Sequence, residues 1–330
     1  MPSANSWMKS SSGEAGKTFM KKIDPSKIKT YSLKARPSKV TIDEFSRPHR
    51  KGGSFQDFIA SLPNILAARH LKDVVAAVVQ ARKDKRPVML GMGAHSIKVG
   101  LNPVIIDLME RGIITSLSLN GAGVIHDFEL AFIGRTSEDV DKEILSGAFG
   151  MADETGSMIN GAIQAAAGEP NTGIGQAVGR MIQDGEFPYK DKSLLAAGIR
   201  LGVPVTVHVA IGTDIIHMHP SFDGGATGTL AQRDFLTFCA LVADLEGGVY
   251  INLGSAVLLP EIFLKAVTLC RNLGHTLQHF TTVNMDFIQH YRPNTNVVRR
   301  PTMGGGRGFA ITGHHEIMFP LLAAAITEQF

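Results

Sequence analysis

A histidine and an acid stand side by side just after a run of small residues. The stretch SLSLNGAGVIHD (116–127) alternates polar and apolar residues, breaks at Asn120–Gly123 and then places His126 beside Asp127. An imidazole at a helix start is a candidate general base, because the helix N-terminus lowers its pKa. The pair is therefore a candidate catalytic acid–base pair. In the alternative interpretation, Asp127 merely caps the helix.

Lys98 is a second residue that could do chemistry, because it follows the glycine-containing loop Gly91–His95. It could pair with a phosphate, or form an imine with a carbonyl substrate if it were desolvated. A solvated lysine in the first turn of a helix fits the same pattern.

Two histidines in the segment HMHPSFDGG, His217 and His219, follow Asp214. Histidines two apart in an extended segment point to one side and can share a metal ion. No third ligand stands at a defined spacing, so we expect polar loop histidines and no metal site.

A basic cluster close to the C-terminus could clamp an anionic substrate, because arginine binds carboxylate or phosphate through two hydrogen bonds. A structural salt-bridge network is the alternative. The glycine run MGGGRG (303–308) that follows it could form a mobile lid, a phosphate-binding nest or an ordinary loop. The cluster consists of His290, Arg292, Arg299 and Arg300.

Alternating strands and helices would position these residues. Five apolar runs (87–92, 114–120, 203–211, 249–253 and 276–286) are separated by segments with helical spacing of apolar residues. This alternation predicts an α/β fold: a Rossmann-like, doubly wound parallel sheet with helices on both faces. The region around 135–190 is expected to be a helical insertion.

Small or polar residues recur where the predicted strands end. In a doubly wound sheet these ends share one edge, where ligands bind and glycine lets main-chain amides approach phosphates. The recurrence favours a nucleotide-like ligand, although no GxGxxG motif is present. The strand-end residues are Gly91, Gly93, Asn120–Gly123, Gly212–Asp214, Gly254, Ser255 and Thr282–Asp286.

In their order, these loops resemble the deoxyhypusine synthase family over about residues 70–330. The resemblance rests on LGMGAHSIKVGL, IITSLSLNGAGVIHDFELAFIG, VPVTVHVAIGTD, GGVYINLGSAV, FTTVNMD and EIMFPLLAAAI. It implies a Rossmann-like fold that binds NAD, and a homo-oligomer that is expected to be a tetramer. The NAD contacts that it implies are Gly93, His95, Lys98, Asn120, Gly121, Ala122, Gly212, Thr213, Asp214, Gly254, Ser255, Thr282, Asp286, His314 and His315.

The sequence departs from that family where its imine-forming lysine would stand. The matching stretch is NVVRRP, with Arg299 and Arg300, and guanidinium cannot serve as the amine nucleophile. The tryptophan expected there is also missing, since Trp7 is the only one in the chain. His126 stands where the family has an acid.

From these features we expect an NAD-dependent enzyme of deoxyhypusine synthase-like type, but not a true deoxyhypusine synthase. Its reaction would begin with hydride transfer from an amine-containing or anionic small molecule, with His126 as base and the arginine cluster as anchor. The alternatives are a non-catalytic nucleotide-binding or regulatory protein, a metal-dependent hydrolase on the histidine loops, and a genuine aminobutyl transferase.

Composition limits the class of protein further. Residues 1–40 carry nine Lys or Arg against Glu14 and Asp24, so the net charge of +3 divides into +7 there and −4 in the rest. We expect a basic, mostly flexible arm over 1–45, a single domain over 46–330 and no nucleic-acid partner. Two cysteines without metal-ligand spacing, and no long apolar segment, predict a cytoplasmic protein that is not inserted in a membrane.

Overall fold

The computed structural model describes residues 21–330 and divides the chain into two units, Met1–Thr41 and Ile42–Phe330. In the first unit, the described residues are exposed and form two single-turn 3₁₀ helices, η1 (Pro25–Lys27) and η2 (Leu33–Ala35). The boundary precedes the one expected at residue 45. The short helix η3 (Ile42–Glu44) belongs to the second unit, where Glu44 forms an ion pair of 3.0 Å with Arg69.

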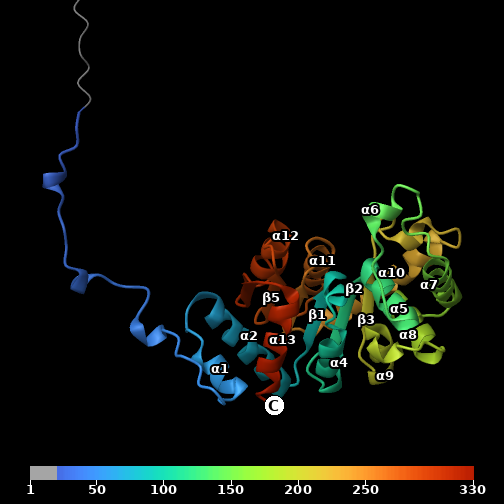
Figure 1. The fold of residues 1–330 in the computed structure, drawn as a ribbon, viewed down its shortest axis with the longest axis horizontal. Helices are drawn as coiled ribbons and strands as arrows, with labels where there is room; N and C mark the ends of the chain where they lie inside the picture. The colour runs from blue at the N-terminus through green and yellow to red at the C-terminus, as the bar shows by residue number, and fades with distance from the viewer. Residues whose placement is uncertain (1–20) are drawn as a thin grey trace, which may run out of the picture. The chain divides into compact units, whose positions relative to one another are not determined.

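A six-stranded parallel sheet forms the centre of the second unit, as predicted (Figure 1). The strand order is β3-β2-β1-β4-β5-β6, so the chain builds the sheet outward from β1 to β3 and then restarts beside β1 with β4. The switch point between β1 and β4 is where such sheets open a crevice at their carboxyl edge. The strands are β1 (Val88–Met92), β2 (Ser116–Asn120), β3 (Val205–His208), β4 (Val249–Leu253), β5 (Thr281–Asp286) and β6 (Arg307–Thr312).

Strand β6 was missed by the sequence interpretation, which expected the glycine run to form a lid, a phosphate-binding nest or an ordinary loop. A Cβ on Gly306 would lie 2.5 Å from the carbonyl oxygen of Phe280, and one on Gly308 would overlap that of Val298. These glycines therefore let β6 pack closely against neighbouring backbone. They also lie at the amino end of β6, opposite the edge where the ligand was expected.

Helices cover both faces of the sheet and create two hydrophobic cores. One core packs α2, α4, α5 and α13 against residues such as Leu90, Leu117 and Ile251. The other packs α10 and α11 against Met89 and Tyr250. The side-chain alternation of the strands divides their apolar residues between the two cores. These helices are α2 (Leu66–Lys83), α4 (Asn102–Glu110), α5 (Gly121–Ile133), α10 (Gly224–Ala243), α11 (Leu258–Asn272) and α13 (His315–Thr327).

The region expected as a helical insertion forms α6 (Val140–Glu143), α7 (Asp153–Ala166), α8 (Ile174–Asp184) and the 3₁₀ turn η4 (Lys190–Lys192). Asp234 of α10 ties this region to the sheet, because its carboxylate accepts N–H groups from Gly175 of α8 (3.1 Å) and Val207 of β3 (2.9 Å). The shorter elements α1 (Phe55–Ser61), α3 (His95–Lys98), α9 (Leu194–Leu201), η5 (Ile215–Met218), α12 (Tyr291–Pro293) and η6 (Asn294–Arg299) complete the fold.

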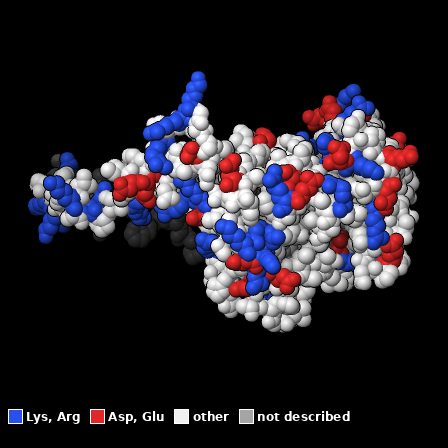
Figure 2. Space-filling view, turned by 90° about the horizontal axis from the view of Figure 1, so that it is seen from below, with Lys and Arg blue, Asp and Glu red and all other residues white. Residues whose placement is uncertain are grey.

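Within residues 21–330, no helix is both long and apolar enough to cross a membrane. On the face of the molecule drawn in Figure 2, basic and acidic side chains are interspersed over the second unit.

Candidate functional site

Two glycines bring the ends of β1 and β4 together at the switch point. The N–H of Gly93 donates to the carbonyl of Leu253 (3.0 Å), and a Cβ on Gly93 would lie 2.5 Å from the carbonyl oxygen of Gly254. Gly254 has a φ of +66°, a conformation that side chains with a Cβ rarely adopt. Both positions therefore need glycine for backbone reasons.

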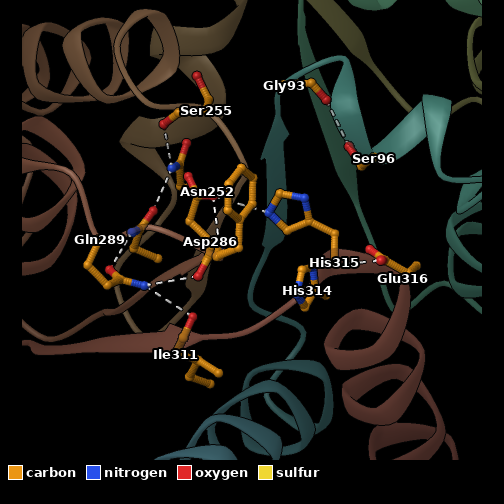
Figure 3. A network of polar contacts seen from close by, with 12 residues as sticks. Gly93, Ser96, Asn252, Ser255, Asp286, Gln289, Ile311, His314, His315 and Glu316 are labelled. Atoms are coloured by element: carbon orange, nitrogen blue, oxygen red, sulfur yellow. Dashed lines mark hydrogen bonds and ion pairs between the residues drawn. The ribbon is translucent and has the colours of Figure 1, made fainter.

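His315, the first residue of α13, lies against Gly254 at this point. Figure 3 shows His315 together with Asp286. The Nε2 of His315 is 3.5 Å from Oδ1 of Asp286, the last residue of β5. The two side chains are almost fully buried, and neither ring nitrogen of His315 has a hydrogen-bond partner. Buried polar groups are normally paired, so this histidine is the most conspicuous polar group at the carboxyl edge.

Two further rings lie against His315. His95 lies 5.3 Å from it between ring centroids, and Phe287 lies 5.8 Å from it. Phe287 also stacks on the exposed His314, with an interplanar angle of 6°. Burial lowers the pKa of His95, and a charge on His315 lowers it further, which favours the neutral ring. Lys98, at the end of α3, is exposed.

A buried amide network that the sequence interpretation missed fixes the neighbouring loops. The side-chain nitrogen of Asn252 donates to the carbonyl of Ser255 (2.9 Å) and to Oδ1 of Asn284 (2.7 Å). Asn284 donates to Gln289 (2.7 Å). Figure 3 labels Asn252, Ser255 and Gln289 of this network. The sequence signal that could have revealed this network was one asparagine inside each of the apolar strands β4 and β5. The hydroxyl of Ser255 accepts the N–H of Leu259 (3.2 Å), in the first turn of α11.

The second loop is closed by side chains. Asn120 accepts the N–H of Gly123 (2.9 Å), and the carboxylate of Asp214 accepts that of Ala122. A Cβ on Gly121 would overlap the Asp214 carboxylate. The amides at the start of α5 that were expected to meet a cofactor are therefore engaged by an amide oxygen and a carboxylate.

Asp214 also faces His217 across the third loop. The N–H groups of Gly212 (3.1 Å) and Asp214 (3.3 Å) both donate to Nδ1 of His217, so the neutral ring carries its proton on Nε2. That Nε2 lies 3.9 Å from Oδ2 of Asp214, and neither atom has a hydrogen-bond partner. Burial raises the pKa of Asp214 to about 6. Thr213 donates to the carbonyl of Ala210 (2.7 Å) and stabilises the turn.

The structure gives Asp127 a structural role in place of the expected catalytic one. Its carboxylate accepts the N–H groups of Leu194 (2.8 Å) and Leu195 (3.1 Å), together with hydrogen bonds from Ser193 and Asn102. Asp127 thus caps helix α9, not its own helix α5. The residue is fully buried, and burial raises its pKa to about 6. His126 has different partners, Thr136 and Glu129.

Thr282 also lies away from the expected site. It is the second residue of β5, four residues before Asp286, which places it roughly 13 Å from the carboxyl edge at the usual strand rise. Its hydroxyl donates to the carbonyl of Val297 (2.8 Å). The side chain therefore anchors η6 to the sheet.

Arg292 of the basic cluster lies on α12 and Arg299 on the π-helix η6, and His290 and Arg300 flank these two elements. Arg292 pairs with Glu261 of α11 (3.4 Å), and Arg300 donates to Asn296 (2.9 Å). Arg299 and His290 are exposed. Among residues 21–330, no group of three or more His, Cys, Asp or Glu is arranged to hold a metal ion.

No protein-family profile and no curated protein matches the sequence. Solved structures match the fold. AgrE in its ternary complex with ornithine and NAD+ has 12% identity and a TM-score of 0.53 over 78% of this chain and 32% of that chain. Unliganded AgrE has 15% identity and a TM-score of 0.52, over 79% and 32% of the two chains. A candidate deoxyhypusine synthase from Entamoeba histolytica has 11% identity and a TM-score of 0.47 over 85% of this chain and 95% of that chain.

This chain spans about a third of the length of the AgrE chains. At these identities, the likeness shows the α/β fold that the sequence predicted.

Proposed function

We propose that this chain is an NAD-dependent enzyme of deoxyhypusine synthase-like type, whose reaction begins with hydride transfer from an amine-containing or anionic small molecule. One observation supports this most strongly. His315 lies at the switch point between β1 and β4 beside Asp286, with both ring nitrogens unpartnered. A ligand that hydrogen-bonds to this buried ring would satisfy it. The fold shared with AgrE, which was solved with NAD+, agrees with this proposal.

The polar groups at the carboxyl edge suit the parts of a dinucleotide. His315, His95 and Asp286 can bind ribose hydroxyls or a carboxamide, and the exposed Lys98 offers a charge for phosphate. The carboxylate of Asp214 at the start of α5 would repel phosphate there. We therefore place the diphosphate near α3 instead of at α5.

Bound NAD would supply the hydride acceptor. The chain itself must orient the substrate and take up the proton released on oxidation. We propose His126 as the base, and Arg299 as an anchor if the substrate is anionic, because Arg292 and Arg300 already have partners. Since arginine cannot form an imine, we expect no transfer through a covalent intermediate at the NVVRRP segment.

Calorimetric titration with NAD tests this proposal. We expect saturable binding that His315→Ala weakens roughly tenfold or more, because the variant removes a buried hydrogen-bonding ring. Asp286→Asn, which keeps the side-chain shape, should weaken binding as well. The matched control is His279→Ala at the amino side of β5, where His279 pairs with Glu246 (3.1 Å) away from the site.

Absence of NAD binding by a folded wild-type protein would contradict the proposal, and so would equal affinities for all three variants. If NAD binds but no NADH forms with a panel of polyamines and amino acids, the non-catalytic nucleotide-binding alternative gains support. The expected tetramer stays a separate prediction, which light scattering on the purified protein would test.

A further inference from the structure

His126 belongs to a chain of short polar contacts at the end of α5. Helix α5 stops at Gly134, whose φ of +71° turns the chain back along the helix. This turn brings the hydroxyl of Thr136 to 2.6 Å from Nδ1 of His126 and into hydrogen-bond contact with Glu129 Oε2. From α7, Thr155 donates to the other oxygen of Glu129 (3.1 Å).

The proton positions in this chain follow from counting hydrogens. Burial raises the pKa of Glu129, but the hydrogen bonds from Thr136 and Thr155 and the nearby His126 ring outweigh it and lower this pKa. Glu129 is therefore a carboxylate and only accepts. The single hydroxyl hydrogen of Thr136 therefore points to Glu129. Its oxygen can then only accept from His126, which requires a proton on Nδ1 of the imidazole.

We propose that Thr136 and Glu129 are positioning residues that hold His126 in the Nδ1–H tautomer and so keep its Nε2 free to accept a proton. The catalytic role of this tautomer rests on the proposed function, in which His126 is the base. The assignment of the tautomer does not depend on that function. When Nε2 takes a proton from the substrate, the ring becomes an imidazolium. Its charge then lies 3.8 Å from the Glu129 carboxylate, with Nδ1–H still bonded to Thr136.

The contrast with His217 gives an internal reference. Two main-chain N–H groups donate to Nδ1 of His217, which assigns its proton to Nε2, opposite to His126. Side-chain contacts thus select the Nδ1–H tautomer at His126, whereas main-chain N–H groups select the Nε2–H tautomer at His217.

A cavity of about 340 Å³ lies beside this chain of contacts, lined by Glu129, Thr136, Thr155, Arg135 and Glu154 among others. The Glu129 carboxylate therefore borders a cavity that is large enough for water molecules, and the His126 side chain is 17% exposed. Within residues 21–330, the hydroxyl of Thr136 links His126 to Glu129 through hydrogen bonds to both side chains, so Thr136 is the position to vary.

Long-range proton–nitrogen NMR of the full chain, labelled with ¹⁵N-histidine, tests the proposal. We expect His126 to show a protonated Nδ1 and an unprotonated Nε2, and His217 the reverse. Thr136→Val should shift His126 toward the Nε2–H form, Thr136→Ser should restore it, and Glu129→Gln should also change it. Thr155→Val is the matched control, because it removes a partner of Glu129 without touching His126.

An unprotonated Nδ1 at His126 in the wild-type protein would overturn the inference, as would an unchanged tautomer in a folded Thr136→Val protein. The NAD affinity of these variants should equal that of the wild type. A failure of the tautomer assignment can therefore be told apart from a failure of NAD binding.

Discussion

Replacing Tyr250 by phenylalanine should stabilise the protein. Tyr250 is fully buried in β4, its ring stacks on Phe263 at 3.9 Å, and its hydroxyl has no hydrogen-bond partner. Burial raises the pKa of this hydroxyl, so it stays neutral. Tyr250→Phe removes only the unpaired group and keeps the stacked ring.

The size of the effect follows from two opposing contributions. A buried hydroxyl without a partner lowers the stability by about 1–3 kcal/mol. Removing its oxygen leaves a small void, and the cost of this void offsets part of the gain. We expect a net gain of about 1 kcal/mol in the free energy of unfolding. For a chain of this size, that corresponds to a rise of roughly 1–3 °C in Tm.

Calorimetry and urea unfolding of a double-mutant cycle with Gly91→Ala measure the effect. A Cβ on Gly91 would overlap the Tyr250 hydroxyl oxygen, whereas the nearest ring carbon is 3.0 Å away. Gly91→Ala should therefore cost less in the Tyr250→Phe background than in the wild type. If Tyr250→Phe instead lowered the stability by more than about 1 kcal/mol, the hydroxyl would have a partner and the reasoning would be wrong.

Two further predictions concern buried acids. Asp127→Ala should lower the free energy of unfolding by about 3 kcal/mol or more, because it leaves the capped end of α9 without its acceptor. Urea unfolding measures this cost, with Asp107→Ala, a half-buried acid paired with Arg111, as the control. Equal costs for the two variants would contradict the prediction. Burial raises the pKa of Asp234 to about 7, above its unfolded value of 3.8, so the folded protein binds the extra proton between these values. The contribution of Asp234 to the free energy of unfolding is fully present below pH 4 and is lost as the pH rises through 7. The total contribution is on the order of 4 kcal/mol. Asp234→Asn should flatten the pH dependence of Tm between pH 4 and 7, and an unchanged slope would show that the carboxylate does not titrate there.

The fold could be predicted from the sequence because its pattern is local. Apolar runs separated by helical segments indicated the parallel sheet, and five of its six strands were found. Strand β6 escaped because RGFAIT follows a glycine run and buries only two of its residues, Phe309 and Ile311, so it has little of the apolar character of a buried strand.

The site was predictable only in part, because hydrogen-bond partners far apart in the sequence decide the role of each residue. Asp286 was named from a strand end and His315 from the family resemblance, and the structure brings them together. Asp127 was named as one member of a catalytic acid–base pair with His126, but its partners on α9, more than sixty residues away, make it a cap. A sequence pattern shows that a group is placed near an edge. It does not show what already binds that group.

The outer side of β3 has a consequence for how copies of this protein could associate. Asp234 takes the N–H of Val207, and Gly175 of α8 sits so close to the carbonyl of Val205 that a Cβ there would overlap it. The N–H of Val207 is thus occupied and α8 covers the strand at Val205, so this rim of the sheet cannot recruit a strand from another molecule. Any continuous sheet built across two copies would have to join them through β6, whose first residue is the charged Arg307.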